Sequence, residues 1–406
     1  MTLSKETLSE LAERYGTPLY VYDGDVAVKR YRELFDFISW RPLRLHYAMK
    51  ANYNPILLKL LRDAGAAIDA VSPAEVALVT ALGFKKEDII YTANNMTDAE
   101  VAEVMDTGVL FNIGSLSRLG KFAKAYPGSR ICLRFNPDVV DGAHKHIMTG
   151  GDLTKFGILM KDADKAAEIA RSANLEVVGL HEHTGSGLQH AESVFKSMEN
   201  LMSLATPERF PNLQFLDFGG GFKVPYNPDE ERIDYPKMGA EIAERFADFA
   251  DRYGKDDIEM RFEPGKYIVA EAGFLLARVN TIKDNNGRLI AGCDSGFPQL
   301  IRPILYDAYH HIVNLSNPDG EPKKYDVCGN ICESGDRFAE QRQLPEVREG
   351  DLLAIENAGA YCYSMGSVYN LRPMPPEVVV ANGETILTKP RISNKQLAES
   401  ILEGVK

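Results

Sequence analysis

Lys50 is the residue whose type and position best suit covalent chemistry. It lies in HYAMKAN (residues 46–52), directly after a run of strand-forming residues. A lysine at the end of a mostly buried strand loses hydration, so we expect its pKa to be lowered, as an imine-forming amine requires. Taken alone, a lysine that reaches solvent from the rim of the fold is the commoner situation, so the assignment depends on the neighbours of Lys50.

Three further segments could serve the same chemistry. Gly219, Gly220 and Gly221 are consecutive, and their backbone N–H groups could approach a phosphate closely, although such a run equally suits a flexible turn. Glu263 could keep a pyridinium nitrogen protonated, or it could form a salt bridge at the rim. His183 could stack on the same ring, or it could be a core histidine hydrogen-bonded to a neighbouring strand.

The sequence gives little support for a metal site. His181 alternates with His183, but no further group of ligands follows at a spacing that suits zinc. The five cysteines are odd in number and also lack metal-ligand spacing. We therefore expect no metal.

The chain must position these residues on a repeated framework. Between residue 43 and about residue 263, strand-like runs alternate with helical patterns, which is typical of βα units around a parallel sheet. Eight runs predict a (βα)8 TIM-like barrel, in which chemistry lies at the carboxyl ends of the strands. The predicted strands are LRLHYA (43–48), AIDAV (67–71), IIYT (89–92), VLFNI (109–113), RICLRF (130–135), EVVGLHEH (176–183), LQFLDF (213–218) and IEMRFE (258–263).

Polar residues collect where these strands end, which supports the barrel. Asp69 lies on the second strand, and Arg134 and Asn136 end the fifth. The residues after two of the strands also predict helix starts. Ser72 and Glu75 form a possible capping box, and Thr97 with Asp98 opens the next helix. The segment 137–157 is a long irregular connection of the kind that is usually functional or mobile.

After Glu263 the pattern changes to β-type runs without long helices, which predicts a C-terminal β-barrel or β-sandwich domain. The first 16 residues have an amphipathic helical pattern, and the run 19–23 could add a strand to the second domain. We expect residues 1–27 to join the β domain, 28–272 to form the barrel and 273–406 to form the β domain.

Composition excludes several classes of partner. The net charge of -12 is spread along the chain, which disfavours nucleic acid and anionic membrane surfaces. No apolar stretch approaches the roughly 20 residues that span a bilayer, and the amino terminus lacks a signal-peptide pattern. A reducing cytoplasm fits the cysteine usage best.

Taken together, the motifs resemble the alanine racemase-like, or fold-type III, pyridoxal 5'-phosphate (PLP) enzymes, and within them the diaminopimelate decarboxylases most closely. The resemblance covers nearly the whole chain, and its motifs occur in the same order. They are HYAMKAN (46–52), HEHTGS (181–186), DFGGGF (217–222), EPGK (263–266), RPILYDAYH (302–310), CESGD (332–336) and GAYCYSMGSVYNLRP (359–373).

The resemblance implies PLP as cofactor and assigns a role to each matching residue. Lys50 is implied to hold the cofactor as a Schiff base, His183 to stack on its ring and Glu263 to hold the pyridinium nitrogen. Ser186 is implied to bind the phosphate together with the glycines and Tyr361. The full set implied to bind the cofactor is Lys50, Asp69, Arg134, His183, Ser186, Gly219, Gly220, Gly221, Glu263, Pro264, Gly265, Lys266 and Tyr361.

The resemblance also implies a homodimer with active sites shared between subunits. Cys332 and Glu333 would reach the cofactor of the partner chain, and Cys332 would reprotonate the carbanion left after carbon dioxide departs. The implied reaction is decarboxylation of meso-2,6-diaminopimelate at its D-centre to L-lysine, the last step of lysine biosynthesis. The distal end of this substrate carries a carboxylate and an ammonium, and the residues implied to bind substrate are Lys266, Arg302, Tyr306, Glu333 and Tyr361.

One departure from the family pattern concerns this distal pocket. The family usually has arginine where this chain has Lys266, and lysine keeps the charge but loses bidentate geometry. Three alternatives remain open: a related decarboxylase acting on carboxynorspermidine, D-ornithine or D-lysine, a racemase, and a regulatory homologue without turnover. Retention of Lys50, Glu263 and Cys332 disfavours the regulatory homologue, and the CESGD segment fits decarboxylation better than racemisation.

Overall fold

Eight parallel strands close into a barrel in the computed structural model, which describes residues 1–139, 154–185 and 190–403. The ring closes because β5 pairs with β6 and because β2 pairs with both β3 and β10. The predicted barrel is therefore confirmed, with each strand within a few residues of its expected bounds. The strands are β2 (Leu43–Ala48), β3 (Ala67–Ala70), β4 (Ile89–Tyr91), β5 (Leu110–Ile113), β6 (Arg130–Asn136), β8 (Glu176–His181), β9 (Phe215–Asp217) and β10 (Glu259–Phe262).

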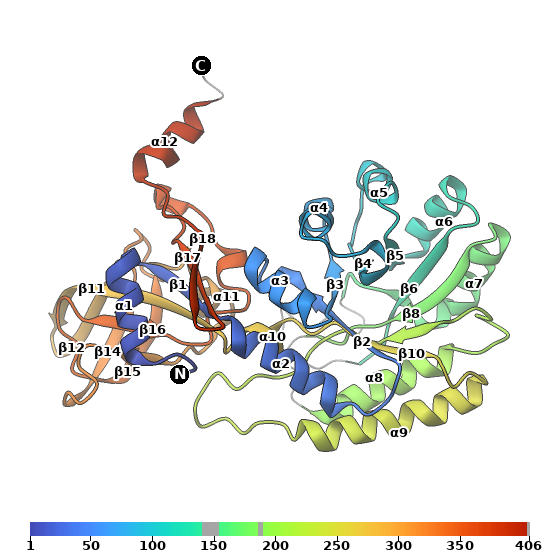
Figure 1. The fold of residues 1–406 in the computed structure, drawn as a ribbon, viewed down its shortest axis with the longest axis horizontal. Helices are drawn as coiled ribbons and strands as arrows, with labels where there is room; N and C mark the ends of the chain where they lie inside the picture. The colour runs from blue at the N-terminus through green and yellow to red at the C-terminus, as the bar shows by residue number, and fades with distance from the viewer. Residues whose placement is uncertain (140–153, 186–189, 404–406) are drawn as a thin grey trace.

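Helices surround this ring and pack their apolar faces on it (Figure 1). A short strand, β7 (Ile158–Leu159), adds to the end of β6, and the turn η1 (Met49–Ala51) follows β2 directly. The helices are α2 (Gly24–Phe37), α3 (Pro55–Asp63), α4 (Pro73–Ala81), α5 (Asp98–Met105), α6 (Leu116–Ala125), α7 (Ala163–Ser172), α8 (Ala191–Leu204), α9 (Tyr235–Tyr253) and α10 (Lys266–Val269).

The two predicted helix starts differ in their capping. Thr97 begins α5 with a complete capping box, because its side chain accepts from Glu100 N–H and the Glu100 carboxylate accepts from Thr97 N–H. Ser72 caps α4 by accepting from Glu75 N–H, but the Glu75 carboxylate accepts from Val71 N–H at 2.7 Å instead. The second capping box is therefore only half formed.

Residues alternate in direction along the barrel strands, so every second side chain faces the barrel interior. Ile90, Cys132, Val178 and Phe215 form a small buried cluster of their own in four of these strands, and Leu110 packs against it. Nearer the carboxyl ends the buried side chains are polar, and they include Asp69, Asn112, Arg134, His181 and Asp217. This polar end is where a barrel carries its chemistry.

A nine-stranded mixed sheet forms a second unit beside the barrel (Figure 1). Strand β1 pairs antiparallel with β11 and parallel with β17, so the run 19–23 does join this sheet. The exact domain boundaries at residues 27 and 272 stay a prediction. The strands are β1 (Leu19–Asp23), β11 (Gly273–Asn285), β12 (Arg288–Cys293), β13 (Ile312–Asn314), β14 (Pro322–Cys328), β15 (Arg337–Pro345), β16 (Leu352–Ile355), β17 (Glu377–Ala381) and β18 (Glu384–Lys389).

Three helices accompany this sheet. The amphipathic amino-terminal segment forms α1 (Lys5–Tyr15), whose Leu8 and Leu11 are buried in a cluster with β1 and β11. Helix α11 (Arg302–Tyr306) carries two residues of the expected site. The sequence did not predict α12 (Asn394–Leu402), which projects from the sheet near the C-terminus and buries no residue in this chain (Figure 1).

Two predicted features fall partly outside the described residues. Most of the connection 137–157 and all of Ser186 lie there, so their predicted roles are untested. Among the described residues, no helix is long and apolar enough to cross a membrane.

Candidate active site

Lys50 occupies η1, immediately beyond the carboxyl end of β2. Its Nζ forms an ion pair with Asp69 Oδ2 from the neighbouring strand β3. The Asp69 side chain is fully buried, whereas the Lys50 side chain is 38% exposed and so remains reachable. Desolvation alone would lower the pKa of Lys50, but the nearby Asp69, Tyr361 and Glu263 raise it above its usual value. The expected lowering of this pKa is therefore wrong, because the carboxylate supplied by the adjacent strand outweighs burial.

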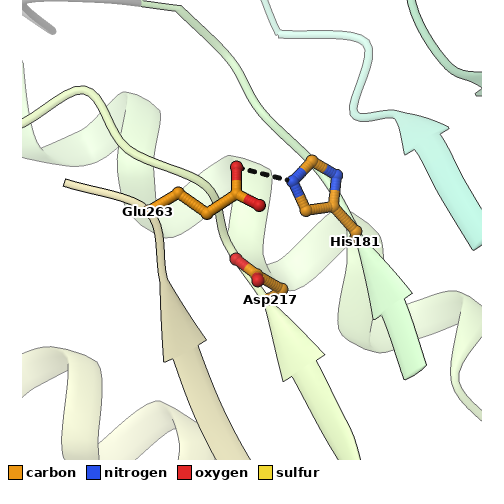
Figure 2. A group of neighbouring side chains, drawn as sticks. All are labelled: His181, Asp217 and Glu263. Carbon is orange, nitrogen blue, oxygen red and sulfur yellow. Dashed lines mark hydrogen bonds and ion pairs between the residues drawn. The ribbon is translucent and has the colours of Figure 1, made fainter. Parts of the chain in front are cut away.

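Glu263 follows β10 and faces His181, which ends β8 (Figure 2). His181 Nε2 lies 3.0 Å from Glu263 Oε2, with both side chains buried. Burial lowers the pKa of His181 well below its usual value, and Arg134 acts in the same direction, so the ring is neutral. Burial also raises the pKa of Glu263, although Lys50 and Arg134 oppose this shift. A neutral Nε2–H that donates to Glu263 favours the ionised carboxylate and fixes its orientation.

Asp217 completes this group from the end of β9 (Figure 2). The ligand-type atoms of His181, Asp217 and Glu263 all lie within 4.8 Å of one another, although His181 and Asp217 were not among the predicted site residues. Burial raises the pKa of Asp217 well above its usual value, and the charge of Glu263 adds to this effect. The spacing of residues along the chain does not reveal this group, because the fold brings two carboxylates from other strands to His181.

Gly219 and Gly220, the first two of the three glycines after β9, pack tightly against His183 and Glu263. Gly219 N–H donates to Asp217 Oδ1 at 2.9 Å, and Gly220 N–H donates to His183 Nδ1 at 3.1 Å. A Cβ placed on Gly220 would lie 2.5 Å from the Glu263 carbonyl oxygen, so no larger residue fits there. The amides of Gly219 and Gly220 are therefore occupied within the chain, and phosphate binding by the three glycines stays a prediction. Position 220 therefore requires glycine because a side chain would collide with the backbone at Glu263.

The segment after Glu263 closes the pocket against Lys50. Pro264 accepts a backbone hydrogen bond from Ala48 N–H, and Gly265 leaves room for the Tyr361 hydroxyl, which would lie 3.2 Å from a Cβ at that position. Tyr361 adopts a positive φ of 57° and donates its own N–H to the Ala51 carbonyl. One pocket is thereby lined by Ala48, Lys50, His183, Gly220, Gly221, Phe222, Glu263, Pro264, Gly265, Lys266, Tyr267 and Tyr361.

Arg134 lies at the same mouth of the barrel, on β6. It is buried, with its guanidinium 4.7 Å from the centre of the Phe156 ring. Its charge acts on Glu263 and Asp69, so Arg134 lies among the acidic groups of the site.

Thr92, which directly follows β4, was not predicted as a site residue, although its hydroxyl donates to Glu263 at 3.5 Å. The signal that could have revealed Thr92 and His181 is their inward position where a barrel strand ends.

A second part of the site carries positive charge. Arg302 begins α11 and is 7% exposed, and its guanidinium lies 4.6 Å from the centre of the Tyr226 ring. Arg302 Nε has no hydrogen-bond partner among the described residues. Lys266 begins α10, is 8% exposed and is close enough to Arg302 for the charges to repel. Tyr306 lies in α11 one turn after Arg302, in electrostatic range of Tyr361.

Cys332 and Glu333 are not part of this pocket in their own chain. Both are exposed on the second unit, where Cys332 N–H donates to Asn370 Oδ1 and Glu333 accepts a hydrogen bond from the Tyr369 hydroxyl at 2.9 Å. The structure thus brings together the predicted cofactor residues that it describes, and it leaves Cys332 and Glu333 facing outward.

The residues present fit a PLP molecule. A reachable lysine amine, a buried carboxylate held by a neutral histidine, and a glycine loop without space for side chains face one pocket. These are the groups that a pyridoxal ring, its nitrogen and its phosphate require.

Comparison with known proteins agrees with this chemistry. Residues 26–270 match the family model described as "Pyridoxal-dependent decarboxylase, pyridoxal binding domain". The chain is 44% identical to diaminopimelate decarboxylase of Methanothermobacter thermautotrophicus, over 94% of this chain and 91% of that protein. A crystal structure of a diaminopimelate decarboxylase superposes with a TM-score of 0.90 at 32% identity, covering 99% of this chain and 97% of that one. The enzyme of Helicobacter pylori, solved in complex with L-lysine, gives 0.89 at 30% identity and covers 98% and 100%. The chain therefore belongs to the diaminopimelate decarboxylase family of pyridoxal-dependent decarboxylases.

Proposed function

We propose that this protein removes the carboxylate at the D-centre of meso-2,6-diaminopimelate and releases L-lysine and carbon dioxide. The observation that carries this choice of substrate is the pair of buried basic side chains, Arg302 and Lys266, of which Lys266 lines the pocket that contains Lys50. No carboxylate pairs with either side chain among residues 1–139, 154–185 and 190–403. A site with buried basic groups that lack a carboxylate partner favours a substrate whose distal end carries a carboxylate.

The cofactor would be held by groups from four barrel-strand ends, those of β2, β8, β9 and β10, and by Tyr361 from the second unit. Lys50 would bind it covalently, Glu263 would keep its ring nitrogen protonated, and His183 would flank the ring. The loop at Gly219–Gly221, Ser186 and Tyr361 would accommodate the phosphate. When bound, PLP supplies an electron sink for the electron pair left by the departing carboxylate.

Other residues of the chain would prepare the site for this reaction. Asp69 would hold the Lys50 amine in place and keep it protonated before the cofactor binds. His181 would keep Glu263 ionised by donating from Nε2. Arg302, Lys266 and Tyr306 would hold the distal carboxylate, and Glu333 would take the distal ammonium. Because both ends of the substrate carry these two groups and differ only in configuration, holding both groups at once would select the L-centre for the distal position and leave the D-centre at Lys50.

Replacing Arg302 tests the distal pocket. We expect Arg302→Ala to lower kcat/KM for meso-diaminopimelate by about 30-fold or more, because losing one partner of a buried charged contact costs roughly 2 kcal/mol or more. D-Lysine lacks only the distal carboxylate, so its slower decarboxylation should change little. The absorbance of the bound cofactor reports that the variant is still folded and loaded. An unchanged preference for meso-diaminopimelate over D-lysine would contradict the role of Arg302.

We further propose a homodimer in which each active site uses two subunits. Cys332 and Glu333 face outward, and Cys332 would donate a proton to the carbanion in the partner's site. Exposed apolar side chains also occur on the nearby segments, which suits a contact surface. They are Ile304 at 42%, Leu305 at 37%, Val368 at 42%, Tyr369 at 42% and Leu371 at 56% exposure.

Mixing two inactive variants tests the shared site. Lys50→Ala and Cys332→Ser proteins, each impaired alone, should regain about a quarter of the parent activity after random exchange of subunits. Half of the dimers would then be mixed, and each mixed dimer would have one intact site out of two. If mixing restores no activity although subunits exchange, Cys332 does not act in the partner's site.

We also infer a cytoplasmic location. All five cysteines are free thiols in the structure, and Cys332 would have to stay reduced to donate a proton. Measuring the thiol content of the purified protein under non-reducing conditions tests whether these thiols stay reduced, and five reactive thiols after denaturation are the expected result.

A further inference from the structure

The guanidinium of Arg302 is held by an aromatic ring rather than by a polar partner. The Arg302 side chain is 7% exposed, and no hydrogen bond or ion pair from the described residues reaches its guanidinium. The guanidinium lies over the ring of Tyr226, 4.6 Å from its centre. The face of an aromatic ring attracts a cation, and the attraction is stronger when both groups are shielded from water. In the described part of the chain, the Tyr226 ring is therefore the group best placed to set the direction of Arg302.

Tyr226 belongs to the barrel unit but reaches the unit that carries Arg302. It lies in the long connection between β9 and α9, where its N–H donates to the Glu230 carboxylate at 2.8 Å. The carbonyl of the preceding residue, Pro225, accepts a hydrogen bond at 3.2 Å from Asn357 Nδ2 of the second unit. These two contacts fix the backbone on both sides of the Tyr226 ring.

His310 fixes the plane of the Tyr226 ring. The two ring centres are 5.3 Å apart, and the ring planes are at 85° to each other, which is a favoured arrangement of aromatic rings. His310 is fully buried, and its Nδ1 donates to the Glu356 carbonyl at 2.9 Å because a carbonyl oxygen can only accept. The Tyr226 ring is thus held at its backbone and against His310, with Arg302 over its face.

The hydroxyl of Tyr226 takes no part in this arrangement. It is buried and has no hydrogen-bond partner among the described residues. Removing the hydroxyl therefore breaks no contact within the described chain, whereas removing the ring leaves the Arg302 guanidinium without its neighbour. Phenylalanine and leucine at position 226 separate these two effects.

We propose that Tyr226 is a positioning residue for substrate specificity, whose ring holds the Arg302 guanidinium in the direction that receives the distal carboxylate. This inference rests on the proposed function, which assigns that carboxylate to Arg302. The charge of Arg302 acts on Lys266 and Tyr361, which both line the pocket that contains Lys50. A guanidinium without the ring would have to be ordered anew by each substrate molecule, which lowers affinity. Tyr226 itself exchanges no proton and acts through Arg302 alone.

Replacing the ring tests this role in the PLP-loaded enzyme. We expect Tyr226→Leu to lower kcat/KM for meso-diaminopimelate about 10- to 30-fold, because a desolvated contact between a cation and a ring is lost. The loss should appear mainly in KM, since the distal carboxylate is bound before the reaction begins. D-Lysine lacks this carboxylate, so its kcat/KM should stay within about twofold of the parent value. Tyr226→Phe keeps the ring and should resemble the parent enzyme with both substrates.

Two further measurements separate positioning from packing. In an Arg302→Ala background, Tyr226→Leu should change kcat/KM for meso-diaminopimelate by less than about twofold, because residues that act through one contact are not additive. Pentafluorophenylalanine at position 226 keeps the shape of the phenylalanine ring but removes the negative potential of its face. It should therefore reduce the preference for meso-diaminopimelate over D-lysine relative to Tyr226→Phe. This comparison stands if Tyr226→Leu does not fold, and the absorbance of the bound cofactor shows that each variant is loaded.

Each other outcome has a definite meaning. Equal losses with meso-diaminopimelate and D-lysine would make Tyr226 a packing residue and overturn the inference. A loss in Tyr226→Phe as large as in Tyr226→Leu would assign the effect to the hydroxyl and overturn it as well. If Arg302→Ala loses the preference for meso-diaminopimelate but Tyr226→Leu keeps it, the inference fails and the proposed function stands. If Arg302→Ala also keeps the preference, the proposed distal pocket fails and the inference fails with it.

Discussion

Replacing His181 with leucine should weaken cofactor binding without disturbing the fold. His181 Nε2 lies 3.0 Å from Glu263 Oε2, and the two side chains are 0% and 5% exposed. Water therefore cannot replace the lost donor. A hydrogen bond to a charged group contributes about 1.5–3 kcal/mol, so the ionised form of Glu263 loses that much stabilisation and its pKa rises further.

PLP needs the ionised carboxylate of Glu263 beside its ring nitrogen, so the lost stabilisation of that carboxylate should weaken PLP binding. We expect the dissociation constant of PLP to rise roughly 10- to 150-fold, as 1.4 kcal/mol corresponds to a factor of ten. Because the pKa of Glu263 is raised, a larger fraction of Glu263 is neutral at low pH, and the ionised fraction increases as pH rises. The loss should therefore be largest at low pH and shrink at higher pH. Titration of the apoenzyme with PLP between pH 6 and pH 9 measures both effects.

His46 provides the matched control. It is also a buried histidine inside the barrel, on β2, but neither of its ring nitrogens has a hydrogen-bond partner among the described residues. His46→Leu therefore changes size and polarity in a similar environment without removing a hydrogen bond from Glu263. Equal losses of PLP affinity in the two variants, or no loss in His181→Leu, would refute the role given to His181.

Two further predictions concern packing and loop position. Gly359→Ala should destabilise the protein by about 3 kcal/mol or more, because the new Cβ would lie 1.7 Å from the Val269 carbonyl oxygen. Gly120→Ala is the control: it lies in α6 with open space around it, so alanine should stabilise the protein by about 0.5–1 kcal/mol. Denaturant unfolding checks both, and equal stabilities would contradict the packing argument. Asp336→Ala should lower kcat and leave the absorbance of the bound cofactor unchanged. The Asp336 carboxylate accepts a hydrogen bond at 2.8 Å from the N–H of Ile331, the residue before Cys332, and so positions the loop that carries Cys332. A kcat equal to that of the parent enzyme would show that this contact does not position the loop.

The sequence predicted those features that depend on local pattern. Each barrel strand is a short run of strand-forming residues bounded by helix signals, so all eight could be placed. Lys50, His183 and Glu263 each follow such a run closely, and the barrel rule then places them at one mouth. The amphipathic pattern of residues 3–15 likewise predicted α1 and its buried leucines.

Features that depend on partners from other strands were not predictable in this way. The pKa of Lys50 is raised because Asp69 comes from the next strand, and no local pattern states that pairing. His181 and Glu263 are 82 positions apart in the sequence and meet only when the ring closes. The amides of Gly219 and Gly220 are occupied by Asp217 and by His183, which depends on the path of the loop.

The most direct test of the proposed activity is carbon dioxide release by the PLP-loaded enzyme, measured separately with meso-diaminopimelate, D-lysine, D-ornithine and carboxynorspermidine. We predict rapid release from meso-diaminopimelate, with L-lysine as the other product, and much slower release from the three compounds that lack its distal pair of carboxylate and ammonium. Equal or faster release from D-lysine or D-ornithine would contradict the role assigned to Arg302 and Lys266, and no release from any of them would contradict the proposed activity.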